Sequence, residues 1–398
     1  MEYLEDRQSS ADEDITNCVE DQDIDQSNQN ITSIEEQRDL QAAFLSDDVP
    51  FGNSSIDNVG NGYAHCEAPP ESAELIYNKQ KIQVNVKDFH NIQHLGKGYF
   101  GSVDSVKIQE HSDVRMAVKR ILRETKEERA SIRLTELKIM QEFGSGICPY
   151  IIDYYGAIID TVSKDSPCFY IIMFFLKDNS ELCICMELMD TTVKKFYETM
   201  HLVEDIDLTS RDRFLSRIIH NIGSALDFLA QKNYLHRDVK PENMLISKHG
   251  MVKLSDFGTC YKINEINSVQ SGAMGTIAYF SPELVRTPSK PSTIQADMWA
   301  LGISLVEIVN GKHPCLASDG TDQFHEILAW NPEVLEATIS VDMQKLILHL
   351  LKEEVEERPC SYADILNMSF IKCLPQRPTN EECNFVNDVI QIIHKPGA

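Results

Sequence analysis

The length, composition and charge of this chain exclude several classes of protein. Its 398 residues are 42% hydrophobic, which is enough to build a substantial core, and its formal net charge is −25. A chain this acidic is not expected to bind nucleic acid or an anionic membrane surface.

The negative charge is concentrated in an N-terminal head. Residues 1–50 contain fifteen Asp and Glu residues but only two basic ones, Arg7 and Arg38, so their net charge is −13. A segment so rich in Asp, Ser, Asn and Gln cannot bury enough apolar surface to offset its loss of chain entropy. We therefore predict an acidic, disordered region over residues 1–84.

The cysteines and the apolar runs favour a soluble, reduced, intracellular protein. The eleven cysteines include no C-x-x-C pair, and Cys183 and Cys185 alternate on one predicted strand, as buried thiols do. The N-terminus lacks the features of a signal peptide. The most hydrophobic run, Cys168–Leu176, is far shorter than the roughly 20 residues of a spanning helix. We expect no membrane association and a cytoplasmic location, with the nucleus as a second compartment.

A glycine-rich loop follows a first predicted strand at Ile82–Val86. The loop reads Leu95-Gly96-Lys97-Gly98-Tyr99-Phe100-Gly101-Ser102-Val103. A G-x-G-x-x-G pattern alone is weak evidence, because dinucleotide-binding folds share it. Here the strand Met116-Ala117-Val118-Lys119 follows closely. Glycines let the backbone approach phosphate groups, and Lys119 would offer its charge to phosphate oxygens. The alternative is an ordinary exposed lysine.

A helix is predicted over Lys126–Phe143, which contains no Gly or Pro. Its apolar positions recur at steps of three and four residues and place Glu136 on the apolar face. A buried carboxylate needs a partner, and Lys119 is the obvious one. The alternative is that Glu136 only borders the apolar stripe, with Glu127 or Glu128 as exposed helix residues.

Two further strands are predicted at Tyr150–Ile159 and Leu182–Leu188, separated by the segment Asp160–Glu181. Glu187-Leu188-Met189 would then form a hinge whose backbone groups face an adenine edge. A helix over Ser210–Lys232 is expected to pack as core, because its apolar residues recur with helical spacing.

The segment Tyr234–Gly258 contains two acidic motifs in order. The first is His236-Arg237-Asp238-x-x-x-x-Asn243, and the second is Asp256-Phe257-Gly258. In such a pattern Asp238 can accept the proton of an attacking hydroxyl, while Asn243 and Asp256 supply oxygens to Mg²⁺. A chance occurrence is the alternative. The two motifs are joined by β-like runs, which makes them typical of phosphoryl transfer.

Two acidic residues downstream have candidate partners. Glu283 and Arg358 could form a bidentate ion pair. Asp297, at the start of an apolar helix, could accept backbone hydrogen bonds from the segment around His236, or could be a simple helix-start acid.

The C-terminal tail carries a strong helix signal. Thr379 and Glu382 form a capping box, and Pro396 and Gly397 end the helix. The apolar stripe contains Phe385, Val386, Val389, Ile390 and Ile393. This stripe could pack back on the main domain or receive another protein, and the residues alone leave both open.

With these residues in place, the chain resembles the eukaryotic protein kinases over residues 85–372. The resemblance implies an α+β, bilobal protein kinase fold: a β-rich N-lobe with one main helix (85–186), a hinge (187–190) and a helical C-lobe (191–372). More closely, the chain is similar to the mitogen-activated protein (MAP) kinase kinases, the dual-specificity middle tier of a three-kinase cascade. The passages that carry this are Met116–Ile121, Cys148–Ala157, Ile184–Met189, Lys195–Tyr197 and Gly302–Glu307.

The resemblance assigns roles to residues of this chain. Asp238 is the expected catalytic base, Lys240 acts on the transferred phosphate beside Thr276 of the substrate loop, and Lys119 and Glu136 form the activating pair. Asn243 and Asp256 are the expected Mg²⁺ ligands. The expected nucleotide-binding residues are Leu95, Gly96, Lys97, Gly98, Tyr99, Phe100, Gly101, Ser102, Val103, Ala117, Lys119, Met186 as gatekeeper, Glu187 and Met189.

The resemblance also implies the cofactors ATP and Mg²⁺ and two protein partners. One is a downstream MAP kinase substrate, and the other is an upstream MAP kinase kinase kinase that docks on the C-terminal helix within residues 373–398. No proline-rich insert follows Gly311, which is similar to the members that act on stress-activated MAP kinases of the c-Jun N-terminal kinase type.

The chain departs from the family pattern at four places. Ser268 and Ser271 are the nearest candidates for regulatory phosphorylation, but they lie one residue closer together than in the family; the alternative is an ordinary polar loop. The head contains no Lys before Lys79, so docking of the substrate through a basic segment is in doubt. Residues 160–181 lengthen a normally tight turn, either as an extended hairpin or as an error in the reading frame. Ser255 stands where the family often has Cys.

Two alternative functions remain at this stage. One is another Ser/Thr kinase, such as a Ste20-like kinase. The other is a pseudokinase scaffold for cascade members, although the presence of Lys119, Asp238, Asn243 and Asp256 weighs against it.

Overall fold

The computed structural model describes residues 72–98, 101–122, 136–144, 146–160, 181–203, 206–263, 274–316, 323–332 and 338–395. Several sequence predictions lie outside these residues. They concern the head over residues 1–71, the loop residues Tyr99 and Phe100, the segment 161–180, and the candidate phosphorylation sites Ser268 and Ser271.

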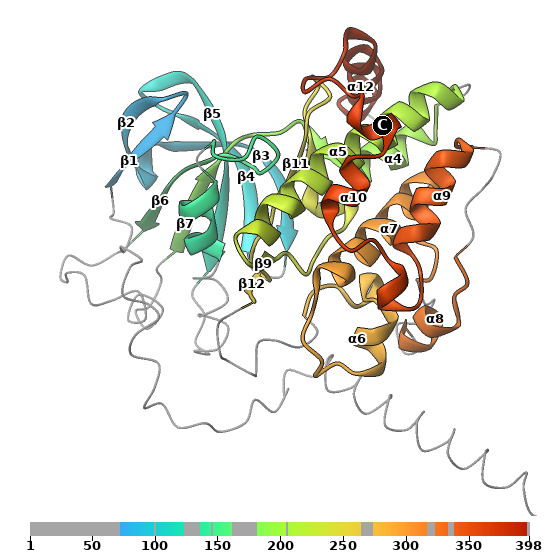
Figure 1. Cartoon of the computed structure of the whole chain (residues 1–398). Coiled ribbons are helices and arrows are strands. Elements are labelled where there is room, and N and C mark those ends of the chain that lie inside the picture. Colours follow the sequence, from blue (N-terminus) through green and yellow to red (C-terminus); the bar gives the residue numbers. More distant parts are fainter. Residues whose placement is uncertain are drawn as a thin grey trace, which may run out of the picture. The chain divides into compact units, whose positions relative to one another are not determined.

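The N-terminal part is a five-stranded antiparallel sheet with the strand order β3-β4-β5-β7-β6 (Figure 1). Its strands are β3 (Phe89–Gly98), β4 (Gly101–Ile108), β5 (His111–Leu122), β6 (Tyr154–Asp160) and β7 (Glu181–Met186). Residues 136–143 form the helix that follows β5. The predicted strands of this sheet are therefore present. Of the helix predicted over Lys126–Phe143, the structure describes residues 136–143, which are helical, while Glu127 and Glu128 lie outside the described residues.

A hairpin that the sequence analysis did not anticipate precedes this sheet. Strands β1 (Ser72–Tyr77) and β2 (Gln80–Asn85) pair antiparallel through a turn in which Asn78 and Lys79 have positive φ. Leu75, Ile82 and Val84 are buried in one apolar cluster with residues of the sheet such as Val106 and Met116. The folded part of the chain therefore begins before the predicted boundary at residue 85, because alternate residues of the hairpin cover one face of the sheet.

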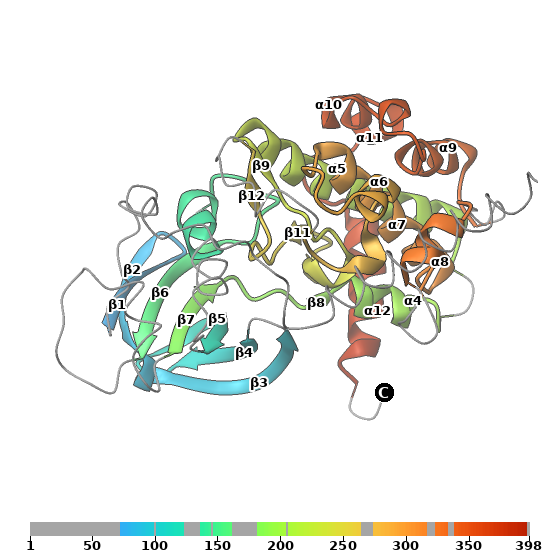
Figure 2. The same cartoon turned by 90° about the horizontal axis from the view of Figure 1, so that it is seen from below.

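The C-terminal part is mostly helical (Figure 2). Its helices are α4 (Val193–Met200), α5 (Leu208–Gln231), α6 (Pro282–Arg286), α7 (Ile294–Asn310), α8 (Gln323–Ala329), α9 (Val341–Leu350), α10 (Tyr362–Leu366), α11 (Ser369–Lys372) and α12 (Asn380–Ile393). Short strands accompany them: β8 (Thr191–Thr192), β9 (Tyr234–Leu235), β10 (Met244–Ile246), β11 (Val252–Leu254) and β12 (Tyr261–Lys262). In the described part of the chain, no helix combines the length and the apolar character needed to cross a bilayer.

Helix α7 forms the centre of the helical part, and nearly all of its residues are buried. The predicted bidentate ion pair between Arg358 and Glu283 connects α7 to neighbouring elements. The guanidinium of Arg358 donates to both carboxylate oxygens of Glu283 at 2.8 Å and also to the carbonyl oxygen of Gln295, at the start of α7. Because the Arg358 side chain is 0% exposed, this pair links α6, α7 and the segment after α9 from inside the core.

The C-terminal helix α12 packs against α4 and α5. Its predicted capping box is present: the side chain of Thr379 accepts from the backbone of Glu382, and the Glu382 carboxylate accepts from the backbone of Thr379. The same carboxylate accepts from Arg217 of α5 at 2.8 Å, with both side chains almost fully buried. The ring of Phe385 contacts Phe214. The apolar stripe of α12 is thus covered by its own domain, which was one of the two predicted alternatives.

Candidate active site

The glycine-rich loop joins β3 and β4 at one edge of the sheet. Gly98 pairs with Gly101 across the two strands, and Gly96 pairs with Val103. Val103 in turn pairs with Lys119 on β5, so the loop and the lysine lie on adjacent strands. Leu95, Lys97 and Ser102 belong to the same two strands.

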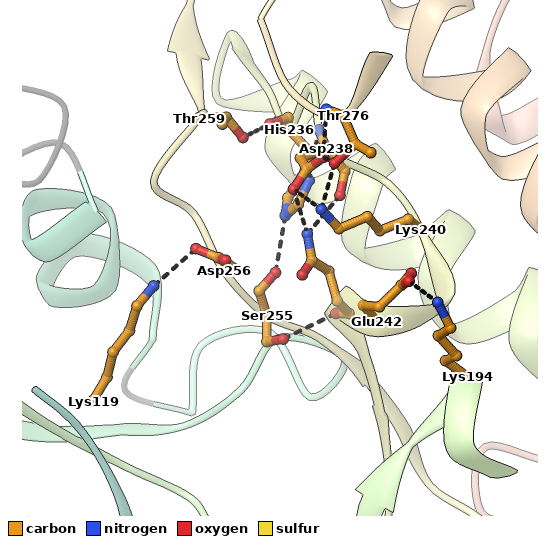
Figure 3. Close-up of polar contacts among 11 residues, drawn as sticks. Lys119, Lys194, His236, Asp238, Lys240, Glu242, Ser255, Asp256, Thr259 and Thr276 are labelled. Carbon is orange, nitrogen blue, oxygen red and sulfur yellow. Dashed lines mark hydrogen bonds and ion pairs between the residues drawn. The ribbon is translucent and has the colours of Figure 1, made fainter. Parts of the chain in front are cut away.

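Lys119 lies between two carboxylates, and Figure 3 shows its contact with one of them, Asp256. Its ammonium group donates to Glu136 Oε1 at 2.6 Å and to Asp256 Oδ1 at 2.9 Å. Burial disfavours the charged form of Lys119, but the carboxylates of Asp256 and Glu136 outweigh burial and raise its pKa. The predicted pair with Glu136 is therefore present, and it places the lysine beside the Asp256-Phe257-Gly258 motif.

Asp238 lies at the centre of a second network, in the segment between β9 and β10. Its Oδ1 accepts from the backbone N–H of Thr276 at 3.0 Å and from the Thr276 hydroxyl at 2.7 Å. Its Oδ2 accepts from Asn243 Nδ2 at 2.8 Å and lies 2.8 Å from the ammonium group of Lys240. Lys240 also donates to the Thr276 hydroxyl. The structure thus brings four predicted site residues into direct contact (Figure 3).

Asp297 of α7 accepts hydrogen bonds from the backbone of the segment between β9 and β10. Asp297 Oδ2 accepts from the His236 N–H and Oδ1 accepts from the Arg237 N–H, both at 2.8 Å. Burial raises the pKa of Asp297, and this is partly opposed by His236. The His236 ring is fully buried and donates from Nε2 to the carbonyl oxygen of Ser255. Of the two predicted roles for Asp297, the structure shows the first: it accepts backbone hydrogen bonds from the segment around His236.

Two residues of the site have left-handed backbone conformations, which residues other than glycine rarely adopt. Arg237 has φ +65° and Asp256 has φ +61°, and such conformations persist only where the surroundings hold them. Gly275 has φ +121°, and a Cβ there would collide with the carbonyl oxygen of Arg237. A glycine at this position is therefore what allows Thr276 to reach Asp238.

The oxygen atoms around Asp256 suit a hard divalent cation. The side-chain nitrogen of Asn243 donates to both the carbonyl oxygen and the carboxylate of Asp238, which leaves the amide oxygen of Asn243 as a donor to a metal. Among the described residues, no group of three His, Cys, Asp or Glu side chains is arranged to bind a metal alone. Asn243 and Asp256 would supply one amide oxygen and one carboxylate to Mg²⁺, beside phosphate oxygens of the nucleotide, as is usual for this ion.

The predicted hinge follows β7. Ala117 pairs directly with Met186, and Met186 and Met189 are both 8% exposed. The N–H of Glu187 donates to the carbonyl oxygen of Asp153 at 2.9 Å, so the backbone group that Glu187 can still offer to a base is its carbonyl.

The sequence did not predict that a buried lysine contacts the hinge. Lys253 donates to Glu187 at 2.6 Å and to Asp153 at 3.2 Å. The only sequence signal is a Lys between the apolar residues Val252 and Leu254 of β11, and such a pattern is equally typical of an exposed lysine on a strand.

A family model described as "Protein kinase domain" matches residues 89–371, which is more than half of the chain. The chain is 28% identical over 328 residues to the dual specificity mitogen-activated protein kinase kinase sek-1 of Caenorhabditis elegans, covering 80% of this chain and 89% of that protein. It is 29% identical over 313 residues to dual specificity mitogen-activated protein kinase kinase 7 of Homo sapiens, covering 77% and 68%. It is also 29% identical over 316 residues to the MAP kinase kinase MKK1/SSP32 of Saccharomyces cerevisiae, covering 75% and 56%.

The family match and the geometry agree. The matched residues contain the glycine-rich loop, Lys119 with its two carboxylates, and the network around Asp238. The chain belongs to the protein kinase family, whose members are phosphotransferases that use ATP and a divalent cation.

Proposed function

We propose that the protein is a dual-specificity MAP kinase kinase that phosphorylates Thr and Tyr in the activation loop of a stress-type MAP kinase. The observation that carries this proposal is the contact set of Asp238, which joins Lys240, Asn243 and Thr276 opposite the Lys119–Asp256 pair. A kinase-like scaffold without activity would not need all of these groups in contact. The names of sek-1 and of the human relative support the dual specificity, and the name of the yeast relative supports a MAP kinase kinase.

The residues divide the reaction between them. ATP would supply the phosphoryl group, and Asn243 and Asp256 would hold Mg²⁺, which would neutralise phosphate charge. Lys119 would bind phosphate oxygens while Glu136 keeps its ammonium group in place. Asp238 orients the substrate hydroxyl and accepts its proton, and Lys240 places a positive charge beside the transferred group. Thr276 fixes Asp238 through its backbone N–H.

Activation by phosphorylation of Ser268 and Ser271 belongs to the same proposal. Arg237 is the receptor that we assign to a phosphate on this loop. Its guanidinium donates to the carbonyl oxygen of Thr259 at 2.7 Å and lies 5.0 Å from the centre of the Tyr261 ring. Burial lowers the pKa of Arg237 to about 10, so the side chain remains charged at neutral pH. A phosphate on the loop could pair with this partly exposed, charged side chain and so order the loop.

Docking of an upstream kinase on α12 also remains a proposal. Val386, Val389 and Ile390 are each 3% exposed, so a partner cannot use this stripe while α12 stays packed. We assign docking to the outer side of the helix, where Asn384 and Asp388 are exposed. Asp388→Arg should then slow phosphorylation of Ser268 and Ser271 by the upstream kinase without altering the activity of protein that is already phosphorylated.

The function can be tested by incubating the Ser268→Glu/Ser271→Glu protein with Mg²⁺, ATP and a panel of purified MAP kinases, and mapping the new phosphates by mass spectrometry. We expect phosphate on both Thr and Tyr of one stress-type MAP kinase, and none with Asp238→Ala. Phosphate on Ser or Thr alone would instead assign the chain to another kinase group, such as the Ste20-like kinases. ATP binding without transfer to any substrate would indicate a scaffold.

A further inference from the structure

The β1–β2 hairpin takes no part in the mechanism above. It precedes residue 89, where the match to the protein kinase family begins. Figures 1 and 2 both show it near β6, which is an edge strand of the five-stranded sheet. The hairpin is therefore an addition to the matched domain, and it adjoins one edge of that domain's sheet.

The hairpin and the nucleotide site lie on opposite faces of the sheet. Leu75 and Val84 of the hairpin belong to one buried cluster with Val118 of β5. Successive side chains of a strand point to opposite faces. Lys119 therefore points away from the hairpin and toward Asp256, to which it donates a hydrogen bond. The hairpin can act on a bound nucleotide only through the sheet.

Strand β1 approaches β6 closely at Gly156. A Cβ at Gly156 would lie 2.5 Å from Leu75 Cδ2, which is inside contact distance, and 3.7 Å from Leu75 Cα. Leu75 is fully buried, so its side chain has no open space beside it. The backbone of β1 thus rests on β6 at a position where only glycine leaves enough room.

Tyr155, the residue before Gly156, is irregular in the sheet. The register between β6 and β7 shifts between Tyr154 and Gly156, so Tyr155 is the extra residue of a β-bulge. A bulged residue is left unpaired in the ladder, and its side chain is directed by other contacts. The ring of Tyr77, at the end of β1, supplies one of them, because the two ring centroids are 5.1 Å apart in an edge-to-face arrangement.

The bulge adjoins the residues that hold the hinge. Tyr154 pairs with Met186, the last residue of β7. The N–H of Glu187 donates to the carbonyl oxygen of Asp153 at 2.9 Å, and the N–H of Asp153 donates to the carboxylate of Glu187 at 3.3 Å. Burial raises the pKa of Tyr155, and the nearby carboxylate of Glu187 raises it further. The position of the first hinge residue therefore depends on the start of β6.

We propose that Tyr77 is a positioning residue for nucleotide binding. By packing on Tyr155 it fixes the bulge at the start of β6, and through Asp153 it keeps Glu187 in the arrangement that receives the adenine base. The inference goes beyond the proposed function, because it rests on nucleotide binding by a protein kinase and not on which protein is phosphorylated. Loss of one aromatic pair changes an equilibrium constant by about tenfold at most, which limits the expected effect.

The test measures the dissociation constant of Mg·ADP for the full chain by isothermal titration calorimetry. Tyr77→Ala should raise this constant by about three- to tenfold, because the bulge loses its aromatic contact. Tyr77→Phe keeps the ring and should bind Mg·ADP as the wild type does. Ile82→Val is the matched control, since Ile82 is buried in the same hairpin cluster. It weakens the packing but leaves the Tyr77 ring in place, so the constant should stay unchanged.

Hydrogen exchange provides an independent measurement. Coupling between two equilibria is reciprocal, so if the hairpin favours binding of ADP, bound ADP must favour the packed hairpin. Mg·ADP should therefore slow amide exchange in the wild-type hairpin by about three- to tenfold. It should not slow this exchange in Tyr77→Ala.

An unchanged dissociation constant in Tyr77→Ala would overturn the inference. An equal increase in Ile82→Val would also overturn it, since the effect would then come from general stability. If Tyr77→Ala did not fold, exchange in the wild type would decide, and exchange that Mg·ADP leaves unchanged would overturn the inference. If the wild type binds Mg·ADP but transfers no phosphate to any protein, the proposed function fails, while the binding constants still decide the role of Tyr77.

Discussion

The two halves of the active site are held by different kinds of contact. Around Asp238, one backbone N–H, an amide and a hydroxyl converge on the carboxylate, and Asp297 accepts from two backbone N–H groups of the same segment. Around Lys119, the position of one ammonium group depends on two carboxylates that belong to different segments. The first half is therefore built into the fold, whereas the second exists only while the helix that carries Glu136 stays in place.

Among the changes considered, removing the Arg358–Glu283 ion pair, which supports the half of the site around Asp238, should reduce stability most. Arg358→Met removes the partner of Glu283 and the donor to Gln295, two residues before Asp297. Because Glu283 would be left as a largely buried charge, we expect a loss of about 3–5 kcal/mol. Urea unfolding followed by tryptophan fluorescence measures it directly, since Trp299 stacks under Arg358. A loss below about 1 kcal/mol would place this pair among ordinary surface ion pairs.

Asp297→Ala should have the next largest effect. It leaves the N–H groups of His236 and Arg237 without their acceptor, which should reduce stability by about 2–4 kcal/mol. The turnover should fall as well, because the segment that carries Asp238 loses its anchor. Asp388→Ala, at an exposed position on α12, is the control and should change neither quantity. If Asp297→Ala kept full turnover, the segment would be held by other contacts.

Breaking the second half should affect activity more than stability. In Glu136→Gln, Lys119 keeps Asp256 but loses its charged partner at 2.6 Å. We expect kcat/KM for ATP to fall by about ten- to a hundredfold, because the lysine is no longer held in the productive position. Steady-state kinetics with Glu142→Gln, an exposed residue of the same helix, provides the control. Equal activities of the two variants would contradict a role for Glu136.

The smallest expected effect is a pH dependence of the stability that the Arg358–Glu283 pair contributes. Burial opposes ionisation of Glu283, but the hydrogen bonds and charge of Arg358 outweigh it and lower its pKa below the ordinary value of 4.5. The pair stabilises the fold fully above pH 4.5, and this contribution is lost as the pH falls through the lowered pKa. The stability difference between the wild type and Glu283→Gln should therefore narrow on acidification. If the stability difference between the wild type and Glu283→Gln stayed constant until acid unfolding, ionisation of Glu283 would not contribute to stability.

The motif residues could be placed from the sequence because their spacing is fixed by the chemistry. Asp238 and Asn243 are five residues apart, and this spacing predicted that both belong to one site, where the structure shows them in contact. Helical spacing together with the cost of a buried charge predicted the pair of Lys119 and Glu136. In both cases a local constraint on few residues determines the geometry.

Other features could not be predicted, because they join residues with no characteristic spacing. Glu307 meets Tyr197 from 110 positions away in the sequence, and Lys194 meets Glu242 across 48. The strand β2 was predicted at Ile82–Val86, but β1 and its pairing with β2 were missed because β1 borders an acidic, polar segment. The two roles of Asp297 predict the same residue at a helix start, and only the fold distinguishes them.

The most direct test of the division between the two halves is the single-turnover rate of phosphate transfer in Asp238→Asn at saturating ATP, with the ATP dissociation constant measured on the same sample. We expect ATP to bind as in the wild type while transfer slows by about a hundred- to ten-thousandfold, because the general base is lost. Transfer at the wild-type rate would show that Asp238 is not the catalytic base.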